Sequence, residues 1–357
     1  MIFVCDILNF AFLIVHSERL HTPHFKLHSC HELSFLHQLN FSDGTTMELS
    51  LIATLVQTAL ELGLISSLTV LALYLSYSML NVCDLSTDGC FTLGAAVGAV
   101  VAINGHPFLS IPAAMLAGML SGFITAVLQT RMGINSLLAG IIVNTGLYSI
   151  NIAIMGNTAI LNMNKTDTVF TKLRDALKET VLADKYTVIV AAIAVVLVLV
   201  FLSLFLKTKL GLAIRATGDN PDMVRSSSIN PVFTTTVGLC VANAFTALSG
   251  CLLAQSQKSV NIDIGSGMVT VALASLLIGT VFLKNKNITL RAVGAVIGAI
   301  VFRLVYTIAL RFNIQASMLK LVSSVIVIIA ISGPYLRQQA PTIKRHLTAS
   351  RKMREGN

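Results

Sequence analysis

The stretch Asp84-Leu85-Ser86-Thr87-Asp88-Gly89 decides the fold, because it places two carboxylates and two hydroxyls between two long apolar segments. Polar groups are costly near hydrocarbon unless protein buries them or they line water. The stretch therefore predicts a discontinuous helix whose restart faces a permeation path. The alternative is a cytoplasmic turn in which Ser86 or Asp88 caps the next helix. The two interpretations are compatible with each other.

The composition around this stretch is that of a polytopic membrane protein. Of the 357 residues, 55% are hydrophobic and only 11% are charged, and the mean hydropathy is +0.80. Soluble domains carry about 25% charged residues, so half that share cannot cover a water-soluble body of this size. The composition argues against a soluble enzyme, a secreted disulfide scaffold and a nucleic-acid-binding protein. We expect an all-α transmembrane bundle with about 8–10 spans of about 20 apolar residues each.

Apolar runs alternate with short polar breaks from Met47 onward. The chain divides into a His-rich N-terminal extension (1–46), a transmembrane domain (47–336) and a basic tail (337–357). Six of the eight histidines lie in the extension, which we interpret as a disordered tail or as sequence upstream of a start at Met47. A metal site at His24, His28 and His31 is the alternative. The predicted spans lie near 55–80, 90–104, 109–130, 134–156, 186–206, 233–255, 267–283, 292–311 and 318–336.

The distribution of charge predicts the orientation of these spans. The formal net charge is +9, and loop 207–231 and tail 337–357 are strongly basic, whereas loop 157–185 is nearly balanced. By the positive-inside rule, loop 207–231 lies in the cytoplasm. Counting spans from there places loop 157–185 outside and the C-terminus inside. The same count places the remaining basic breaks inside, at Arg131, Lys284, Lys286 and Arg291.

Two segments half a chain apart suggest an internal duplication. Asn81-Val82-Cys83-Asp84-Leu85-Ser86 is echoed by Asn261-Ile262-Asp263-Ile264-Gly265-Ser266. Five predicted spans separate the copies, and an odd number makes their topology inverted. Inverted repeats with broken helices at matching positions are typical of transporters. The glycine pairs Gly94/Gly98, Gly118/Gly122 and Gly294/Gly298 predict close helix packing.

Polar residues inside the apolar spans are the next candidates. Arg303 lies deep in the span 292–311, where an arginine is a functional-site hypothesis by default. It is expected to contact substrate or a partner such as Asp263, and the alternative is snorkelling to the surface with Arg311 as an anchor. Four asparagines lie within or beside the apolar spans, where such side chains are expected either to bond a polar solute or, more commonly, to link helices. They are Asn135, Asn144, Asn151 and Asn243.

The loop between the fifth and sixth predicted spans is the most informative stretch. Asp219 or Asn220 can cap a helix that has Pro221 at its first position. This helix, about Pro221 to Ser228, is polar and too short to be stable alone in water. A partner protein would supply the missing contacts, and the alternative is an ordinary connecting loop. The residues of interest are Arg215, Thr217, Gly218, Asp219, Asn220, Pro221 and Met223.

The sequence contains no motif for chemistry of its own. No G-x-x-x-x-G-K-[ST] stretch occurs, so the chain has no phosphate loop with which to use ATP. Neither H-E-x-x-H nor G-x-S-x-G appears, and no catalytic constellation is present. We therefore expect no enzymatic activity and no bound cofactor or metal.

Four regions in order resemble the permease subunits of bacterial ABC importers of the branched-chain amino acid and ribose permease type. The resemblance extends from residue 47 to about 336, and the best match is the branch described as uncharacterised or tryptophan (aromatic amino acid) type. The first region is Asp84–Gly89 with Leu93-Gly94-Ala95-Ala96, and the second is Gly211 to Pro221 with Ile229-Asn230. The others are Asn243 through Gln255, and Phe302-Arg303-Leu304 with Leu319-Lys320-Leu321.

The resemblance implies a pore of two permeases, a homodimer or a pair of sister chains, in the bacterial inner membrane. Two cytoplasmic ATPase subunits would bind ATP, and an extracytoplasmic binding protein or lipoprotein would deliver a small, amino-acid-like solute. The loop 215–231 resembles the coupling helix that docks on the ATPase, although Ser226-Ser227-Ser228 departs from the usual small residues. The path would be lined by Asp84, Ser86, Thr87, Asp88, Asn144 and Arg303. The alternative is a secondary transporter driven by an ion gradient.

Overall fold

The computed structural model describes residues 41–164, 166–176, 185–283 and 287–311, with a few isolated positions between 321 and 332. The chain divides into a unit up to Ile52 and a unit from Ala53 onward. Within the first unit, the described part is the start of helix α2 (Phe41–Leu73), which begins six residues before Met47. The histidines before residue 41, Lys284, Lys286, most of the predicted span 318–336 and the tail 337–357 lie outside the described residues.

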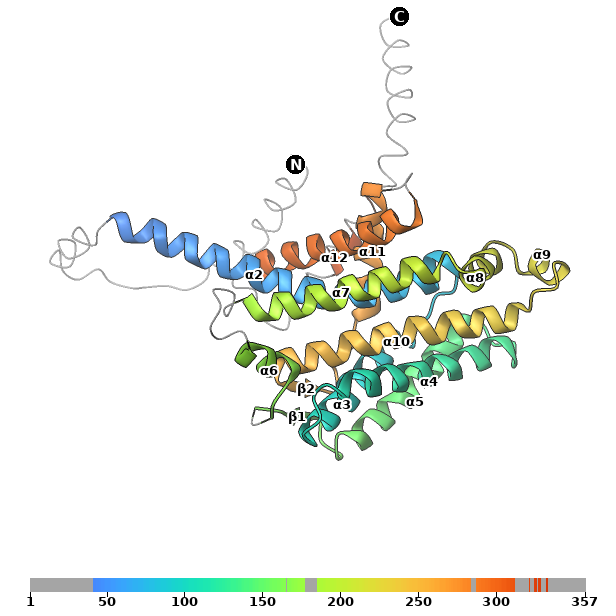
Figure 1. Ribbon diagram of the computed structural model, residues 1–357, viewed down its shortest axis with the longest axis horizontal. Helices are drawn as coiled ribbons and strands as arrows, with labels where there is room; N and C mark the ends of the chain where they lie inside the picture. Colours follow the sequence, from blue (N-terminus) through green and yellow to red (C-terminus); the bar gives the residue numbers. More distant parts are fainter. Residues whose placement is uncertain are drawn as a thin grey trace, which may run out of the picture. The chain divides into compact units, whose positions relative to one another are not determined.

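The second unit is a helical bundle whose elements match the apolar pattern (Figure 1). Each of the first eight predicted spans corresponds to a described helix. Six described helices are long and apolar enough to cross a membrane, and the helices around 87–103 and 268–280 are shorter. In chain order the elements are α2, η3 (Tyr74–Met79, a π-helix), α3 (Thr87–Ile103), α4 (Ser110–Thr130), α5 (Ser136–Ile154), β1 (Ile160–Asn162), α6 (Val169–Ala176), α7 (Tyr186–Phe205), α8 (Lys209–Asp219), α9 (Pro221–Ser226), α10 (Pro231–Gln257), β2 (Ser259–Asn261), α11 (Met268–Leu283) and α12 (Ile288–Arg311).

Helix α10 forms the centre of the bundle and packs closely against α3 and α4. Glycines make this approach possible, as the small-residue pattern predicted. A Cβ added at Gly94 would lie 2.1 Å from the Ala247 carbonyl oxygen, and one at Gly118 would lie 2.4 Å from the Asn243 carbonyl oxygen. Because the obstructing atoms belong to backbone, any larger side chain would push the helices apart. The prediction of close packing is confirmed for these positions.

Helices α3 and α11 are short because both begin inside the bundle. Their N-terminal ends meet, since a Cβ at Gly265 would lie 2.1 Å from the Asp88 carbonyl oxygen. From this meeting point α3 runs alongside α10 toward the C-terminal end of α10, and Gly98 of α3 lies against Cys251 of α10. Helix α11 packs against α12, with Gly279 beside Gly294. The two echoed segments, 81–86 and 261–266, directly precede these two helices.

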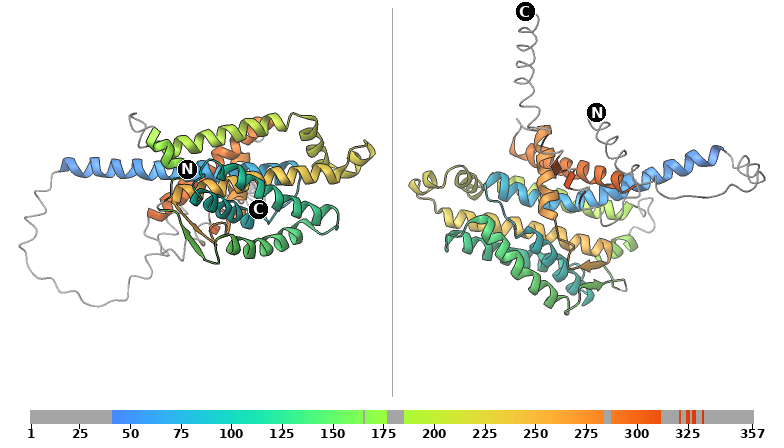
Figure 2. Two further views of the ribbon diagram at one scale, coloured as in Figure 1. Left: turned by 60° about the horizontal axis from the view of Figure 1, so that its bottom comes forward. Right: turned by 180° about the vertical axis from the view of Figure 1, so that it is seen from behind.

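The two ends of the bundle carry different structures (Figures 1 and 2). At one end lie α8 and α9 and the connection from α4 to α5. At the other end lie α6 and a two-stranded antiparallel sheet, in which Ile160 pairs with Asn261 and Asn162 with Ser259. The described parts of loop 157–185 and loop 207–231 therefore lie at opposite ends, as the span count predicted. The sheet was not predicted from the sequence.

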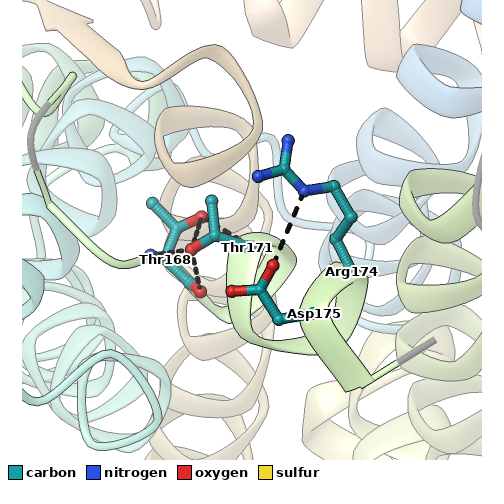
Figure 3. Close-up of polar contacts among 4 residues, drawn as sticks. All are labelled: Thr168, Thr171, Arg174 and Asp175. Atoms are coloured by element: carbon teal, nitrogen blue, oxygen red, sulfur yellow. Dashed lines mark hydrogen bonds and ion pairs between the residues drawn. The ribbon is translucent and has the colours of Figure 1, made fainter. Parts of the chain in front are cut away.

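Helix α6 is held to the bundle by its first turn. The backbone N–H of Thr168 donates to Thr171 Oγ1 at 2.6 Å, and the Thr171 N–H donates to Thr168 Oγ1 at 3.2 Å (Figure 3). This reciprocal pattern satisfies two of the free N–H groups at the helix start. The next N–H, that of Val169, donates to the buried side chain of Gln255 on α10 at 2.9 Å. The loop that carries α6 is thus anchored at the end of α10.

Candidate functional site

A cluster of buried polar side chains lies where α3 begins, and we call it the polar junction (Asp84, Ser86, Thr125 and Asn243). Asp84 is 2% exposed, and its carboxylate accepts hydrogen bonds from the Ser86 N–H at 2.8 Å and from Asn243 Nδ2 at 3.0 Å. The Ser86 hydroxyl accepts from Thr125 Oγ1 at 3.3 Å. Residue 243 is the thirteenth residue of α10, so the junction lies about 18 Å along that helix.

The beginning of α3 differs from the capping prediction. Neither Ser86 nor Asp88 caps α3, because Ser86 occupies the N-cap position without a side-chain hydrogen bond. Asp88 instead accepts from the N–H of Gly267 at 3.0 Å and from that of Val269 at 2.8 Å, and so caps α11. Both helices direct the positive ends of their dipoles at this carboxylate. A single charge in the first turn of α3 thereby stabilises two helix starts.

Helix α5 closes the junction from the side of Gly89. Asn151 is 1% exposed and donates through Nδ2 to the Gly89 carbonyl oxygen at 3.1 Å. A Cβ added at Gly89 would lie 2.6 Å from Asn144 Oδ1, so the close approach requires glycine. Asn151 and Asn243 therefore link helices, which is the more common of the two roles expected for asparagines in apolar spans. Asn135 lies outside the helix interior and caps α5 by accepting from the Leu137 N–H at 3.0 Å.

The predicted path residues are enclosed to different degrees. Asp84, Ser86 and Thr87 are each no more than 2% exposed, and the Thr87 hydroxyl donates to the Asp84 carbonyl oxygen at 2.9 Å. Asp88 and Asn144 are half-buried. The first three side chains thus hold the break in the helix together, and only the last two reach its edge. Thr125 was missed by the sequence analysis, since a threonine in an apolar helix carries no distinct signal.

Arg303 lies apart from the polar junction. It projects from α12 on the side of α2, where a Cβ added at Gly63 would lie 3.5 Å from Arg303 Cβ. Its guanidinium lies over the Tyr306 ring, 5.6 Å from the ring centre, at a distance typical of a cation–π contact. Its Nε is buried and has no hydrogen-bond partner among the described residues. Asp263 is exposed, and the structure does not pair it with Arg303.

The loop 207–231 folds into α8 and the short helix α9. Asn220 caps α9 by accepting from the N–H groups of Asp222 and Met223, both at 3.1 Å, and Pro221 takes the first helical position. The predicted cap and proline are confirmed. We call the exposed residues 219–223 and 225–228 the tip. Met223 is 55% exposed at the tip, whereas Val224 is 1% exposed and packs inward.

Helix α8 fixes the tip to the bundle. The Thr217 hydroxyl is hydrogen-bonded to that of Thr234 on α10 at 2.8 Å. A Cβ at Gly218 would lie 2.1 Å from the Met79 carbonyl oxygen, so α8 packs directly against the end of η3. Thr217 and Gly218 therefore pack against other parts of the chain. Arg215 lines a cleft beside α12.

Six described helices that are long and apolar enough to cross a membrane, with two short helices that start from a shared buried break, define a multi-pass membrane protein. The comparisons with known proteins agree with this class. Residues 37–331 match the family described as branched-chain amino acid transport system, permease component. The chain belongs to this family, and the match begins ten residues before Met47.

Two relatives resemble most of the chain. The tyrosine transport system permease protein of Clostridioides difficile (strain R20291) is 31% identical over 268 residues, which are 74% of this chain and 86% of the relative. An uncharacterized protein of Rickettsia prowazekii (strain Madrid E) is 33% identical over 282 residues, which are 77% of this chain and 96% of the relative. No solved structure matches the chain.

Proposed function

We propose that the chain is the permease subunit of an ATP-binding-cassette importer for a small, amino-acid-like solute. The observation that carries this proposal is the tip, an exposed helix of six residues held out from one end of the bundle. A helix this short is not stable by itself, and all of its residues except Val224 are exposed. A partner ATPase that binds and hydrolyses ATP would complete it. The tyrosine transport system relative supports an amino-acid-like solute.

The tip has the chemistry of a docking element. Met223 offers a flexible apolar side chain that adapts to a groove. Asp222 and Arg225 form an exposed ion pair at 3.6 Å, which is weak in water and can exchange for contacts with a partner. We place this end of the bundle in the cytoplasm, together with the C-terminus, on the basis of the basic loop 207–231. An extracytoplasmic binding protein would then deliver solute at the end that carries α6.

The contacts of α8 support a route from the tip to the polar junction. Gly218 packs against Met79 and Leu80, and Leu80 also lies against α10, where a Cβ at Gly238 would be 2.3 Å from Leu80 Cδ1. Leu80 is four residues before Asp84. A displacement of α8 driven by the ATPase would therefore move the segment that leads into α3. Movement of this segment would open one end of the path and close the other.

The solute path follows α5 in our proposal, because the junction itself is enclosed. Along α5, Thr145 and Ser149 are exposed, and a Cβ added at Gly146 would meet nothing within 4 Å. Asn144 borders this polar strip on the side of Gly89. A second copy of the chain, facing the first across α5, would enclose the strip between two permeases. Asp88 and Asn144 are the two predicted path residues that such a solute can reach.

Substitution of Met223 tests the proposed docking. We expect Met223→Glu to reduce co-purification of the ATPase and solute uptake about tenfold, because it places an unpaired charge in an apolar contact. The matched control is Met132→Glu, which changes a methionine that is 66% exposed at the same end of the bundle. Equal co-purification of both variants with the ATPase would contradict the proposal. Uptake that resists orthovanadate in the purified chain alone would favour a secondary transporter.

A further inference from the structure

Gln255, near the C-terminal end of α10, is a fully buried polar side chain that bonds to two other helices. Its Oε1 accepts from the Val169 N–H, at the start of α6, at 2.9 Å. Its Nε2 donates to Ser110 Oγ, at the start of α4, at 2.6 Å and to Cys251 Sγ at 3.4 Å. Because a backbone N–H can bond only to the oxygen of the amide, the contact with Val169 fixes the direction in which the amide points. One side chain thereby joins α4, α6 and α10.

The contact with Ser110 extends to the connection between α3 and α4. The Ser110 hydroxyl donates to the Pro107 carbonyl oxygen in this connection. A cleft with a volume of about 530 Å³ lies beside it, lined by residues 105–109 and Pro112 and, from α6, by Lys172. Gln255 therefore bonds to the helix starts on both sides of the cleft. Where the cleft separates α6 from the connection, the amide of Gln255 provides a direct bridge.

Helix α6 has a buried first turn and an exposed, charged second turn. Residues 168–171 are buried, whereas Lys172, Arg174 and Asp175 are exposed. Arg174 Nε lies 4.0 Å from Asp175 Oδ1, which is a weak pair in water (Figure 3). The paired threonines of the first turn hold it in one geometry, so a force on the exposed turn moves the helix start as a unit. That start carries the N–H that bonds to Gln255.

Helix α10 connects Gln255 to the polar junction. Asn243 lies twelve residues before Gln255 on the same helix, about 18 Å away along its axis, and donates to Asp84 at 3.0 Å. Every residue from 242 to 255 is buried. Because α3 packs backbone against backbone on this part of α10, a shift of α10 would displace the start of α3 as well. The contact of α6 with Gln255 is therefore linked to the junction through one rigid element.

We propose that Gln255 transmits the docking of the extracytoplasmic binding protein from α6 to α10, and through Asn243 to the polar junction. This inference rests on the proposed function, in which the binding protein delivers solute at the end that carries α6. A protein that binds the exposed turn of α6 would shift the helix start, and the Val169 N–H would move Gln255 with it. Gln255 is thus a positioning residue, and it acts without touching the solute.

ATP hydrolysis by the complete transporter tests this role. The complex of the full chain with its ATPase is reconstituted in proteoliposomes, and hydrolysis is measured with and without the purified binding protein in the form in which it is isolated. In Gln255→Met, which has a side chain of similar length, we expect stimulation by the binding protein to fall at least about fivefold, the lower end of typical coupling between two sites. Basal hydrolysis and co-purification of the ATPase should stay at the wild-type level, because the tip is unchanged. A general loss of packing would instead lower basal and stimulated hydrolysis together.

A second variant breaks the same link without changing Gln255. Val169 is the first residue of α6, where proline is well tolerated, so Val169→Pro removes the donor N–H and keeps the helix. It should lose stimulation as Gln255→Met does. In Gln255→Met/Val169→Pro no backbone N–H is left unpaired at this site, so the midpoint of thermal unfolding should lie closer to the wild type while stimulation stays absent.

The matched control is Gln129→Met on α4, since Gln129 Nε2 is buried and has no hydrogen-bond partner among the described residues. This variant should keep full stimulation. Full stimulation in Gln255→Met and Val169→Pro, a parallel loss of basal hydrolysis in both, or an equal loss of stimulation in Gln129→Met would overturn the role of Gln255 and leave the proposed function standing. A wild-type chain that binds no ATPase, or whose ATPase does not respond to the binding protein, would overturn the proposed function and this inference with it.

Discussion

The polar junction and the tip are both polar interruptions of an apolar chain, yet they differ in how their polar groups are paired. In the junction, Asp84 is 2% exposed and both of its oxygens accept hydrogen bonds from within the protein. At the tip, Asp222 is 86% exposed at its side chain and pairs weakly with Arg225. A buried carboxylate must be fully paired to be tolerated, whereas an exposed one is free to take a new partner. The difference indicates that the junction contributes to stability, whereas the tip is the partner-binding element of our proposal.

Removal of the Asp84 carboxylate should produce the largest effect. Asp84→Ala leaves the Ser86 N–H without its acceptor and Asn243 Nδ2 with only the 3.5 Å hydrogen bond to the Ser86 hydroxyl, at a cost of about 1–3 kcal/mol for each weakened buried group. We expect a total loss of ~3 kcal/mol or more, seen as a lower midpoint of thermal unfolding in detergent. Asp84→Asn keeps one acceptor and should lose less.

The matched control for this prediction is Asp222→Ala at the tip. Its carboxylate is exposed, so we expect a change within about 0.5 kcal/mol. If the two alanine variants unfold at the same temperature, the junction does not stabilise the fold in the way that its hydrogen bonds indicate.

The sequence predicted these two regions unequally. The break at 84–89 and the Asn220–Pro221 helix start were predicted because both depend on residues that are neighbours in the chain. The capping of α11 by Asp88 was not, since the donor N–H of Val269 is 181 residues away. The role of Arg303 in transport stays a prediction, because its described contacts are with α2 and Tyr306.

Helix α8 shows why a motif alone cannot separate docking residues from packing residues. Arg215, Thr217 and Gly218 precede the tip directly and were grouped with it. The helix has a buried face, however, and Thr217 and Gly218 lie on it against α10 and η3. That face can be identified only from the helices that pack against it, α10 and η3, which come from other parts of the same chain.

Loss of the Asp88 carboxylate should have an intermediate effect. Asp88→Ala removes both hydrogen bonds to the start of α11, and loss of a cap costs about 1 kcal/mol, with a smaller contribution from the helix dipoles. We expect a total of ~1–2 kcal/mol, less than for Asp84→Ala, because Asp88 is half-buried and water can replace part of the interaction. Hydrogen exchange at the amides of residues 267–269 should accelerate.

Asp88→Asn provides the matched comparison, since it keeps one acceptor oxygen and loses the charge. It should lie between the wild type and Asp88→Ala. Unchanged exchange at these three amides in Asp88→Ala would show that the meeting of α3 and α11 does not depend on the carboxylate.

The smallest effect is expected at Thr217, which connects the two regions. Thr217→Val keeps the shape of the side chain and removes the hydrogen bond to Thr234, at a cost of about 1 kcal/mol. Thr234 still donates to the Pro231 carbonyl oxygen at 3.0 Å, so its hydroxyl is not left unpaired. Because the tip residues are unchanged, co-purification of the ATPase should stay at the wild-type level. Uptake should nevertheless fall a few-fold, since a loosened α8 transmits less of the ATPase movement to η3.

Two further variants separate this role from a general loss of stability. Thr236→Val removes a hydroxyl that bonds only within α10, to the Val232 carbonyl oxygen at 2.7 Å, and should leave uptake unchanged. In Thr217→Val/Thr234→Val both partners are apolar, so stability should recover while the specific link between α8 and α10 stays absent. Reduced uptake in this stable double variant would assign transmission to the link itself. Normal uptake there would instead show that the tip acts on the junction only through the packing of Gly218 against Met79 and Leu80.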